Sequence, residues 1–550
     1  MEIHLSTVVG ENRPSLRPPP CVIYEDDDLL VVNKPPGLNT HAPAPYVGDG
    51  LFEWLRNREP RWAALGIAHR LDKETSGLMV FGVSARAHKA LSLQFEGRKV
   101  GKRYFCITDR PIDRNEFTVV SALVRAGDRY VGRPLAVGGL RAETRFRVLR
   151  RAGSQTWLEA EPITGRTHQI RVHASESGFP LMGDRLYGGT EAERLGLHSS
   201  CLSLEHPADG RRCEWTVDAD FSRPTADALR DALFDPCETN AWRVRHGAGD
   251  GHAGGYLDRW GEFWLVQIDP AIAGSLLPHT PLPVWVLELF RRHRSAEAGL
   301  YRKRLRRDVG ATAPEDAGPE WVEGDRAPDA LRIRENGVQY ELSFRSGYSV
   351  GLFLDQRENR RRLLTGHVAP DFAISREAEV LNTFAYTCAF SVCAALGGHR
   401  TTSLDLSRKY LDWGRRNFAL NDLDPSPHDF IFGDTFEWLQ RLARKQRKFG
   451  VVLLDPPTFS RSRERGDFRA EHDYGRLVTA ALSVLEPGGV LLASTNAARL
   501  APEDFLEQVR LAIAEAGWRI FREHYAPQPI DFPVTRDEPA YLKTVWLRIG

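Results

Sequence analysis

The 550-residue sequence is poor in cysteine and methionine and has almost no net charge. Its seven cysteines are odd in number and include no C-x-x-C pair, which argues against a disulfide framework or a zinc ribbon and fits a reducing cytoplasm. The 74 basic and 73 acidic side chains nearly cancel, so any surface for nucleic acid has to be local. No apolar run approaches the ~18 residues of a membrane span, and the N-terminus lacks a signal-peptide core. We therefore expect a cytoplasmic protein without a membrane partner.

The pattern of apolar residues changes along the chain and predicts an α/β multidomain fold. Residues 1–20 are polar and Pro-rich, as in a flexible arm. Residues 21–222 consist mainly of strand-like runs with short turns, typical of a mostly antiparallel α+β domain. Residues 223–345 combine a helical stretch, a Gly-rich patch, strands and a linker, and predict a small accessory α+β module. Strands and helices alternate over residues 346–550, which predicts a Rossmann-like parallel sheet.

The stretch HRLDKETSGL (His69–Leu78) places a single carboxylate, Asp72, among a histidine, an arginine and a lysine. Neighbouring positive charge keeps a carboxylate ionised, and an ionised, oriented carboxylate can act as a nucleophile, a base or an electrostatic stabiliser. On these ten residues alone, a surface aspartate in a charged turn is the simpler interpretation.

Three further stretches change that interpretation: VVNKPPGLNTH (Val31–His41), GKRYFCI (Gly101–Ile107) and TGRTHQIRVHASESGFPLMGDRLYGG (Thr164–Gly189). Together with HRLDKETSGL they resemble the large-subunit ribosomal RNA type of pseudouridine synthase, a family that also modifies transfer RNA. The resemblance covers residues 21–207. It implies isomerisation of uridine to pseudouridine in RNA, which needs no cofactor and no metal.

The resemblance also implies roles for individual residues. Asp72 would be the catalytic nucleophile, Arg171 its ion-pair partner and Tyr104 the ring that stacks on the target base. An arginine offsets the cost of a buried carboxylate and fixes its orientation. Residues beside the extruded nucleotide or its phosphates would be His69, Arg70, Arg166 and His168. For His168 a structural or phosphate-contacting role is favoured over a role as an acid-base group.

The back half places polar residues at the ends of successive predicted strands, where open parallel sheets bind ligands. Asp405 follows Asn382 by 23 residues, the spacing of an acid that holds ribose hydroxyls, although the intervening loop lacks G-x-G-x-x-G. Capping of the next helix is the alternative, compatible role for Asp405. The predicted cofactor-binding residues are Asn382, Thr383, Phe384, Tyr386, Thr387, Asp405, Leu406, Asp434 and Asp455.

DPPTF (Asp455–Phe459) resembles class I S-adenosylmethionine-dependent methyltransferases that act on RNA bases. FLDQRENRR (Phe353–Arg361) and NTFAYT (Asn382–Thr387) resemble ribosomal RNA large-subunit methyltransferases, and SLDLSRKYLDWGRRNFALN (Ser403–Asn421) resembles their guanine N7 branch. The middle stretch Thr239–Val266 resembles the accessory domain of such enzymes. The cofactor would be S-adenosylmethionine, and the methyl-acceptor pocket would comprise Asp455, Pro456, Pro457 and Phe459, with Phe459 also contacting RNA.

Relatives that methylate cytosine C5 use a cysteine nucleophile after the DPP strand, but the sequence has no cysteine beyond Cys393. A nitrogen acceptor such as guanine N7 therefore fits better. Local basic runs favour ribosomal or transfer RNA as the partner, and Arg357 and Arg360 in RENRRR are the predicted RNA contacts of the back half. Two alternatives remain open: a back half that only binds RNA, and one that methylates another kind of substrate.

Overall fold

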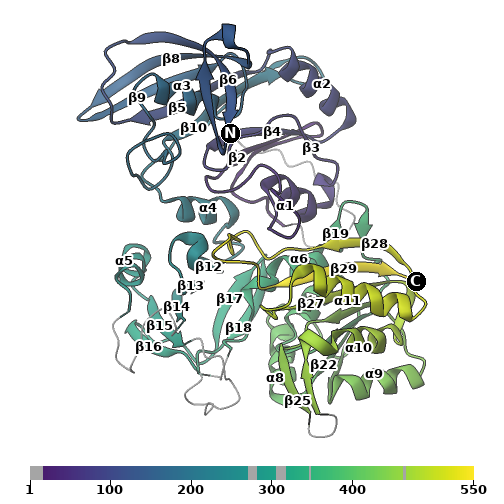
Figure 1. Ribbon diagram of the computed structural model, residues 1–550. Coiled ribbons are helices and arrows are strands. Elements are labelled where there is room, and N and C mark those ends of the chain that lie inside the picture. The colour runs from purple at the N-terminus through teal and green to yellow at the C-terminus, as the bar shows by residue number, and fades with distance from the viewer. Residues whose placement is uncertain (1–15, 270–281, 305–317, 346–348, 463–465) are drawn as a thin grey trace.

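The computed structural model describes residues 16–269, 282–304, 318–345, 349–462 and 466–550, so most of the expected arm and part of the expected linker lie outside it. Three bodies are visible in Figure 1: a front domain, a middle module and a back domain that includes the C-terminus. The predicted α/β multidomain fold is confirmed. Among the described helices, none is long and apolar enough to cross a membrane.

The front domain is built on an 11-stranded mixed sheet with the order β1-β2-β4-β10-β5-β9-β8-β6-β7, flanked by β3 and β11. The described strand pairs of this sheet are antiparallel, except that β4 and β10 pair in parallel. This parallel pair involves Ser76 and Gly77, which belong to the stretch that contains Asp72. The strands are β1 (Val22–Glu25), β2 (Leu29–Lys34), β3 (Gly66–Ile67), β4 (Ser76–Gly82), β5 (Gly101–Thr108), β6 (Glu116–Ala126), β7 (Arg129–Arg133), β8 (Leu140–Ala152), β9 (Gln155–Pro162), β10 (Leu197–Glu205) and β11 (Arg212–Thr216). The helices are α1 (Leu51–Arg58), α2 (Ala85–Glu96) and α3 (Gln169–Glu176).

The middle module contains a five-stranded sheet in which the aromatic strand β14 pairs in parallel with β15. A separate hairpin joins it to the back domain. Its elements are α4 (Thr225–Leu233), β12 (Ala241–His246), β13 (Gly255–Trp260), β14 (Phe263–Ile268), α5 (Val284–His293), β15 (Gly299–Arg304), β16 (Glu320–Gly324), β17 (Leu331–Glu335) and β18 (Val338–Leu342).

The back domain is a seven-stranded sheet with the order β23-β22-β21-β24-β27-β29-β28. The first five strands are parallel and β29 runs antiparallel to both neighbours. The strand order reverses between β21 and β24, which is where sheets of this kind bind ligands. The strands are β19 (His367–Ala369), β20 (Phe372–Ala373), β21 (Val380–Thr383), β22 (Thr401–Asp405), β23 (Asp429–Phe432), β24 (Phe449–Leu454), β25 (Phe459–Ser462), β26 (Gly466–Arg469), β27 (Leu485–Thr495), β28 (Ile520–Tyr525) and β29 (Lys543–Ile549). The helices are α6 (Arg357–Thr365), α7 (Ala389–Leu396), α8 (Arg408–Ala419), α9 (Thr435–Arg444), α10 (Ala470–Leu482) and α11 (Pro502–Glu515).

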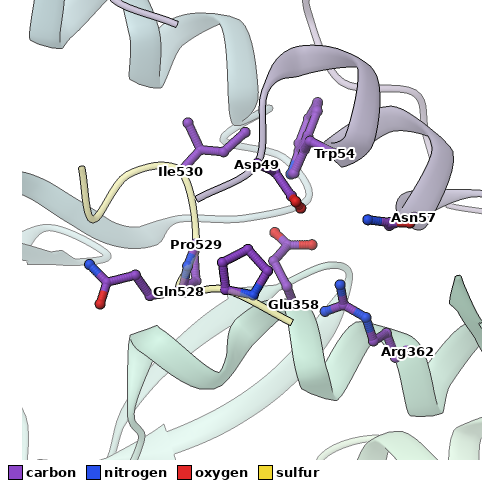
Figure 2. Close-up of a pocket in the computed structure, with 9 residues that line it drawn as sticks. Asp49, Trp54, Asn57, Glu358, Arg362, Gln528, Pro529 and Ile530 are labelled. Carbon is purple, nitrogen blue, oxygen red and sulfur yellow. The ribbon is translucent and has the colours of Figure 1, made fainter. Parts of the chain in front are cut away.

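The front and back domains meet where α1 lies against α6 and β19 (Figure 1). Glu59, directly after α1, pairs with Arg361 of α6, and Arg58 lies 3.4 Å from Glu358. His367 Nε2 lies 3.0 Å from the carbonyl oxygen of Arg56. A small pocket in this boundary is lined by residues of α1, α6 and the segment before β29 (Figure 2). The boundary is therefore a packed polar interface rather than a loose linker.

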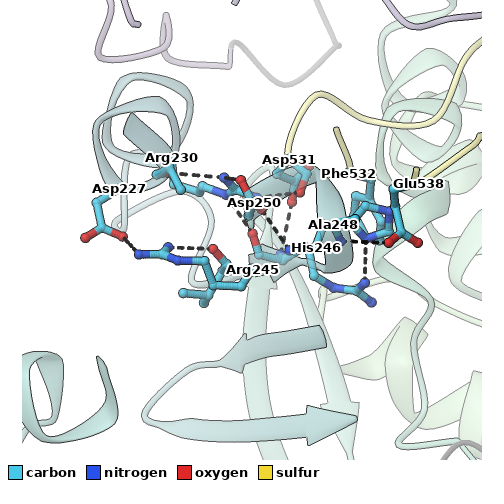
Figure 3. Close-up of polar contacts among 12 residues, drawn as sticks. Asp227, Arg230, Arg245, His246, Ala248, Asp250, Asp531, Phe532 and Glu538 are labelled. Carbon is cyan, nitrogen blue, oxygen red and sulfur yellow. Dashed lines mark hydrogen bonds and ion pairs between the residues drawn. The ribbon is translucent and has the colours of Figure 1, made fainter. Parts of the chain in front are cut away.

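The middle module contacts the segment between β28 and β29 through a buried network of ion pairs and hydrogen bonds (Figure 3). Arg230 of α4 makes two hydrogen bonds to Asp250, at 3.0 and 2.6 Å, and donates to the backbone oxygen of Asp531 at 2.8 Å. Glu538 accepts from the Ala248 amide and from the Tyr256 hydroxyl, both at 2.8 Å. These contacts fix the C-terminal segment of the back domain against the module.

Candidate active sites

Asp72 lies in the wall of an open cavity of about 710 Å³ in the front domain. The cavity is bounded by the turn before β4, by the end of α2, by β5 and by the start of α3. The Asp72 carboxylate is partly buried, with 22% of the side chain exposed. Thr75 N–H donates to the Asp72 carbonyl oxygen at 3.1 Å, which closes the tight turn that presents the side chain.

Arg171 of α3 is the cation nearest to this carboxylate. Its Nη1 lies 3.6 Å from Asp72 Oδ2, so the predicted pair forms. The stronger contact of Arg171 is bidentate: Nε and Nη2 each donate at 2.7 Å to the fully buried carboxylate of Asp184. Asp184 raises the pKa of Arg171 and fixes its guanidinium plane, against the opposing effect of burial. Asp184 therefore orients the partner of Asp72.

The other predicted residues of the front site also line the cavity. Tyr104 is almost fully buried, and burial raises the pKa of its hydroxyl. His69 Nε2 accepts from the Val80 amide at 3.1 Å, and the His69 ring stacks on Phe95. Burial lowers the pKa of His69 to about 3, so this side chain lines the site as a neutral imidazole. Arg70 is exposed and donates to Thr167 at 2.9 Å.

Arg166 lines the cavity and donates from Nε to the Arg141 carbonyl oxygen at 3.2 Å. His168 lies deeper, with its Nε2 3.9 Å from Asp72 Oδ2. Its Nδ1 is 2.8 Å from the Tyr187 hydroxyl. Both ring nitrogens of His168 therefore face protein groups, which favours the structural alternative over a phosphate contact.

In the back domain the loop after β21 turns sharply. Phe384, Tyr386 and Cys388 all have positive φ, of 54°, 48° and 61°, an arrangement that non-glycine residues adopt only when the surroundings hold them. Asn382 and Thr383 bond inward, to Ser391 Oγ at 2.9 Å and to the Leu453 carbonyl at 2.7 Å. The Asn382 amide nitrogen and the Thr383 hydroxyl are therefore already used within the protein.

Asp405, at the end of β22, holds this loop. Its Oδ2 accepts from the Tyr386 amide and its Oδ1 from the Ser407 amide, both at 2.8 Å, while burial raises its pKa. The helix-capping alternative for Asp405 is wrong, because Ser407 is the N-cap of α8 and accepts from the Tyr410 amide, while at this helix Asp405 binds only the amide of Ser407 itself. Thr387 is also anchored, because its hydroxyl donates to the Gly351 carbonyl at 2.7 Å. Asp434 caps α9 by accepting from the Glu437 amide at 3.1 Å.

Leu406 and Phe432 stay exposed, at 52% and 47%, beside the ends of the adjacent strands β22 and β23. Asp405 pairs with Phe432 across the two strands, and Leu406 and Asp434 follow close behind them in the chain, so exposed apolar side chains and acceptor oxygens occur at the same strand ends. This combination fits the adenine and ribose of an adenosine-containing cofactor.

Asp455 ends β24 at the point where the strand order reverses. Gln356 Nε2 donates to its Oδ2 at 3.1 Å and to Ser494 Oγ at 2.8 Å. Burial, followed by the nearby Asp355, raises the pKa of Asp455 to about 7. Pro456 is buried while Pro457 and Phe459 are exposed, so the predicted acceptor pocket has one rigid inner wall and one open aromatic side.

The expectation that Arg357 and Arg360 contact RNA is wrong. Each has only 2% of its surface exposed, because α6 lies inside the protein. Arg357 pairs with Asp531, and Arg360 makes two 2.7 Å hydrogen bonds to Glu335. A buried, paired arginine has no access to phosphate. Phe459, in contrast, is 45% exposed, with the Arg469 guanidinium 5.8 Å from the centroid of its ring.

Comparison with known proteins agrees with the two-site architecture. A family model described as RNA pseudouridylate synthase matches residues 28–176, and one described as S-adenosylmethionine-dependent methyltransferase matches residues 305–548. The chain therefore belongs to the S-adenosylmethionine-dependent methyltransferase family and carries an RNA pseudouridylate synthase domain ahead of the methyltransferase part.

Individual relatives match different parts of the chain. It is 34% identical over 335 residues to a ribosomal RNA large subunit methyltransferase of Deinococcus radiodurans, which covers 58% of this chain and 76% of that protein. It is 36% identical over 213 residues to the ribosomal large subunit pseudouridine synthase D of Pseudomonas aeruginosa, which covers 35% of this chain and 66% of that protein. A ribosomal RNA large subunit methyltransferase K/L of a Psychrobacter species is 42% identical over 168 residues, covering 30% of this chain and 20% of that protein.

Three residues with evident roles at the two sites were not predicted from the sequence: Asp184, Tyr187 and Gln356. Each lies inside a stretch that carries the family resemblance, GDRLYGG or FLDQRENRR. The motifs mark the segments, but only the folded structure shows which residue each of the three contacts.

Proposed function

We propose that the front domain is an RNA pseudouridine synthase with Asp72 as its nucleophile. The observation that carries this proposal is the Asp72 carboxylate at the wall of a cavity, 3.6 Å from an arginine whose orientation a second carboxylate fixes. Tyr104 supplies an aromatic surface in the same cavity, suited to stacking on an extruded base.

The rim of this cavity suits RNA. Basic residues outnumber acidic ones among those that line it, with Glu96 and Glu161 as the acids besides Asp72. The basic lining residues are Arg70, Arg98, Lys99, Lys102, Arg166, Arg171 and Arg212. Positive charge of this kind holds a phosphate backbone independently of sequence, while the pocket itself admits the flipped nucleotide.

We further propose that the back domain methylates a base in RNA, in ribosomal RNA above all. When bound, S-adenosylmethionine supplies an activated methyl group, and Asp405, Leu406, Phe432 and Asp434 would hold its adenosine part. Asp455 would accept hydrogen bonds from a base, and Phe459, which is 45% exposed, would stack on it. The relatives named as ribosomal RNA methyltransferases support the choice of substrate.

A ring nitrogen, with guanine N7 first, is the proposed acceptor atom. Methylation at cytosine C5 needs a thiolate that adds to the ring, and the strand that follows the acceptor site ends in Ser494, Thr495 and Asn496. A nitrogen lone pair needs no such nucleophile. A carboxylate at Asp455 instead suits the N–H donors on the Watson–Crick edge of guanine.

Nucleoside mass spectrometry of ribosomal and transfer RNA from cells that carry the wild type, Asp72→Asn or Asp455→Asn tests both activities. We expect Asp72→Asn to lose one pseudouridine and keep the methylated base, and Asp455→Asn to lose the methylated base and keep the pseudouridine. RNA unchanged in the Asp72→Asn strain would refute the synthase proposal. A methylation unaffected by Asp455→Asn would refute the acceptor site.

A further inference from the structure

His168 occupies an unusual backbone position beside Asp72. It precedes α3 and has a φ of 55°, in the left-handed region that costs a non-glycine residue roughly 1–2 kcal/mol. This conformation turns the imidazole back toward the turn that carries Asp72, so that Nε2 comes within 3.9 Å of Oδ2. The ring also meets Tyr130 and Tyr187 edge-on, with centroids 5.7 and 5.6 Å away.

The contacts of the Tyr187 hydroxyl favour one tautomer of His168. The hydroxyl oxygen accepts from the Tyr130 amide at 3.0 Å, so its own proton is free for His168 Nδ1 at 2.8 Å. A neutral imidazole has one donor and one acceptor nitrogen. With Nδ1 accepting, the ring proton lies on Nε2, which faces Asp72.

The surroundings keep this imidazole neutral. Burial is the main cause that lowers the pKa of His168, and Arg171 and Arg70 lower it further. Asp72 and Asp184 act in the opposite direction without reversing the shift.

We propose that His168 and Tyr187 are positioning residues for Asp72. His168 Nε2 and Arg171 Nη1 both have Oδ2 as their nearest oxygen of the Asp72 carboxylate, at 3.9 and 3.6 Å. Two N–H groups that both lie nearest to Oδ2, beyond direct hydrogen-bond distance in this structure, leave Oδ1 as the oxygen that attacks the uridine. Tyr187 acts at one remove, because its hydroxyl selects the His168 tautomer that can donate. The inference rests on the proposed synthase activity of the front domain.

Tyr187→Phe is the sharpest variant because it removes the hydroxyl and keeps the ring, over which the Arg171 guanidinium lies at 5.0 Å. We expect kcat for pseudouridine formation to fall about tenfold, the rate equivalent of one lost hydrogen bond, with KM changed less than about twofold. Arg185→Ala is the matched control, because Arg185 lies in the same segment with 80% of its side chain exposed, and we expect it to leave both constants unchanged.

A second readout does not depend on activity. In the full chain, NMR of ¹³C-labelled histidine, assigned by comparison with His168→Gln, follows the titration of His168. Tyr187→Phe frees Nδ1 to take a proton, so the His168 pKa has to rise. An unchanged titration together with an unchanged kcat in Tyr187→Phe would overturn the proposal.

The double variant Tyr187→Phe/His168→Gln tests whether Tyr187 acts through His168 or whether the two residues affect the rate independently. If Tyr187 acts through His168, the double variant is no slower than His168→Gln alone. Additive losses would overturn the relay. If the wild type forms no pseudouridine in any RNA tested, the proposed function fails, while the histidine titration still decides whether Tyr187 controls His168.

Discussion

Asp455 is the residue whose ionisation state should control the second chemistry. Its pKa is raised to about 7 by burial and by Asp355, so it is mostly protonated at pH 6 and mostly ionised at pH 8. Because an ionised carboxylate accepts hydrogen bonds from a base and a protonated one loses part of that capacity, we expect methyl transfer to accelerate as pH rises through about 7. Initial rates between pH 5.5 and 8.5 measure this.

Asp455→Asn removes the titration and should give a slower rate without the acid limb. The 3.1 Å hydrogen bond from Gln356 lowers the pKa of Asp455. Gln356→Leu removes this bond and leaves the carboxylate, so the pKa of Asp455 should rise and the acid limb should move to higher pH. The same pH profile in the wild type and in Asp455→Asn would assign the limb to another group.

The residues proposed to react could be predicted from the sequence better than the residues that orient them. The pairing of Asp72 with Arg171 followed from the family resemblance, and the two side chains do lie together. The bidentate partner Asp184 could not be predicted, because one arginine between two carboxylates has no signature in the chain. The same holds for Gln356, whose neighbour Asp455 lies 99 positions away.

At the scale of elements, the alternation of strands and helices could be predicted from the sequence, but the burial of charged side chains could not. The strands and helices that flank NTFAYT and DPPTF appear where the periodicity placed them, as β21, β22, β24, α7 and α8. In contrast, the basic run that forms α6 was expected to contact RNA, yet its arginines are buried in the protein. Their partners Glu59, Glu335 and Asp531 are scattered over the sequence, so only tertiary structure reveals them.

The α6 pairs allow a quantitative prediction. Glu335→Ala leaves the Arg360 guanidinium buried without its partner, and we expect the free energy of unfolding to fall by about 3–5 kcal/mol. Arg360→Met/Glu335→Leu removes both charges and should cost much less. Urea denaturation followed by circular dichroism measures the difference.

The exposed pair of Arg415 and Asp412 is the control, with 45% and 63% of the side chains exposed. Asp412→Ala should change stability by at most about 0.5 kcal/mol. A double variant of the buried pair as unstable as Glu335→Ala would show that packing, not the unpaired charge, accounts for the loss.

At the scale of the whole molecule, the contact between the front and back domains contains an acid whose ionisation depends on pH near neutrality. Asp49 comes from the front domain and points toward Glu358 of α6 (Figure 2). Burial is the main cause that raises its pKa to about 7; Glu53 and Glu358 also raise it, while Arg362 and Asn57 act in the opposite direction. The protonated form is therefore the one that suits the interface near neutral pH.

Because Asp49 binds its proton more tightly in the folded protein than in the unfolded chain, its contribution to stability is greatest at low pH. That contribution is lost as pH rises from about 4 through about 7. We expect Asp49→Asn to be more stable than the wild type at pH 8 by about 1–2 kcal/mol, with the difference shrinking toward pH 5. Differential scanning calorimetry at the two pH values measures it, with Asp412→Asn as the exposed control. Equal stabilisation by Asp49→Asn at both pH values would mean that Asp49 does not titrate between them. Protonation of Asp49 would then make no contribution to the stability of the interface.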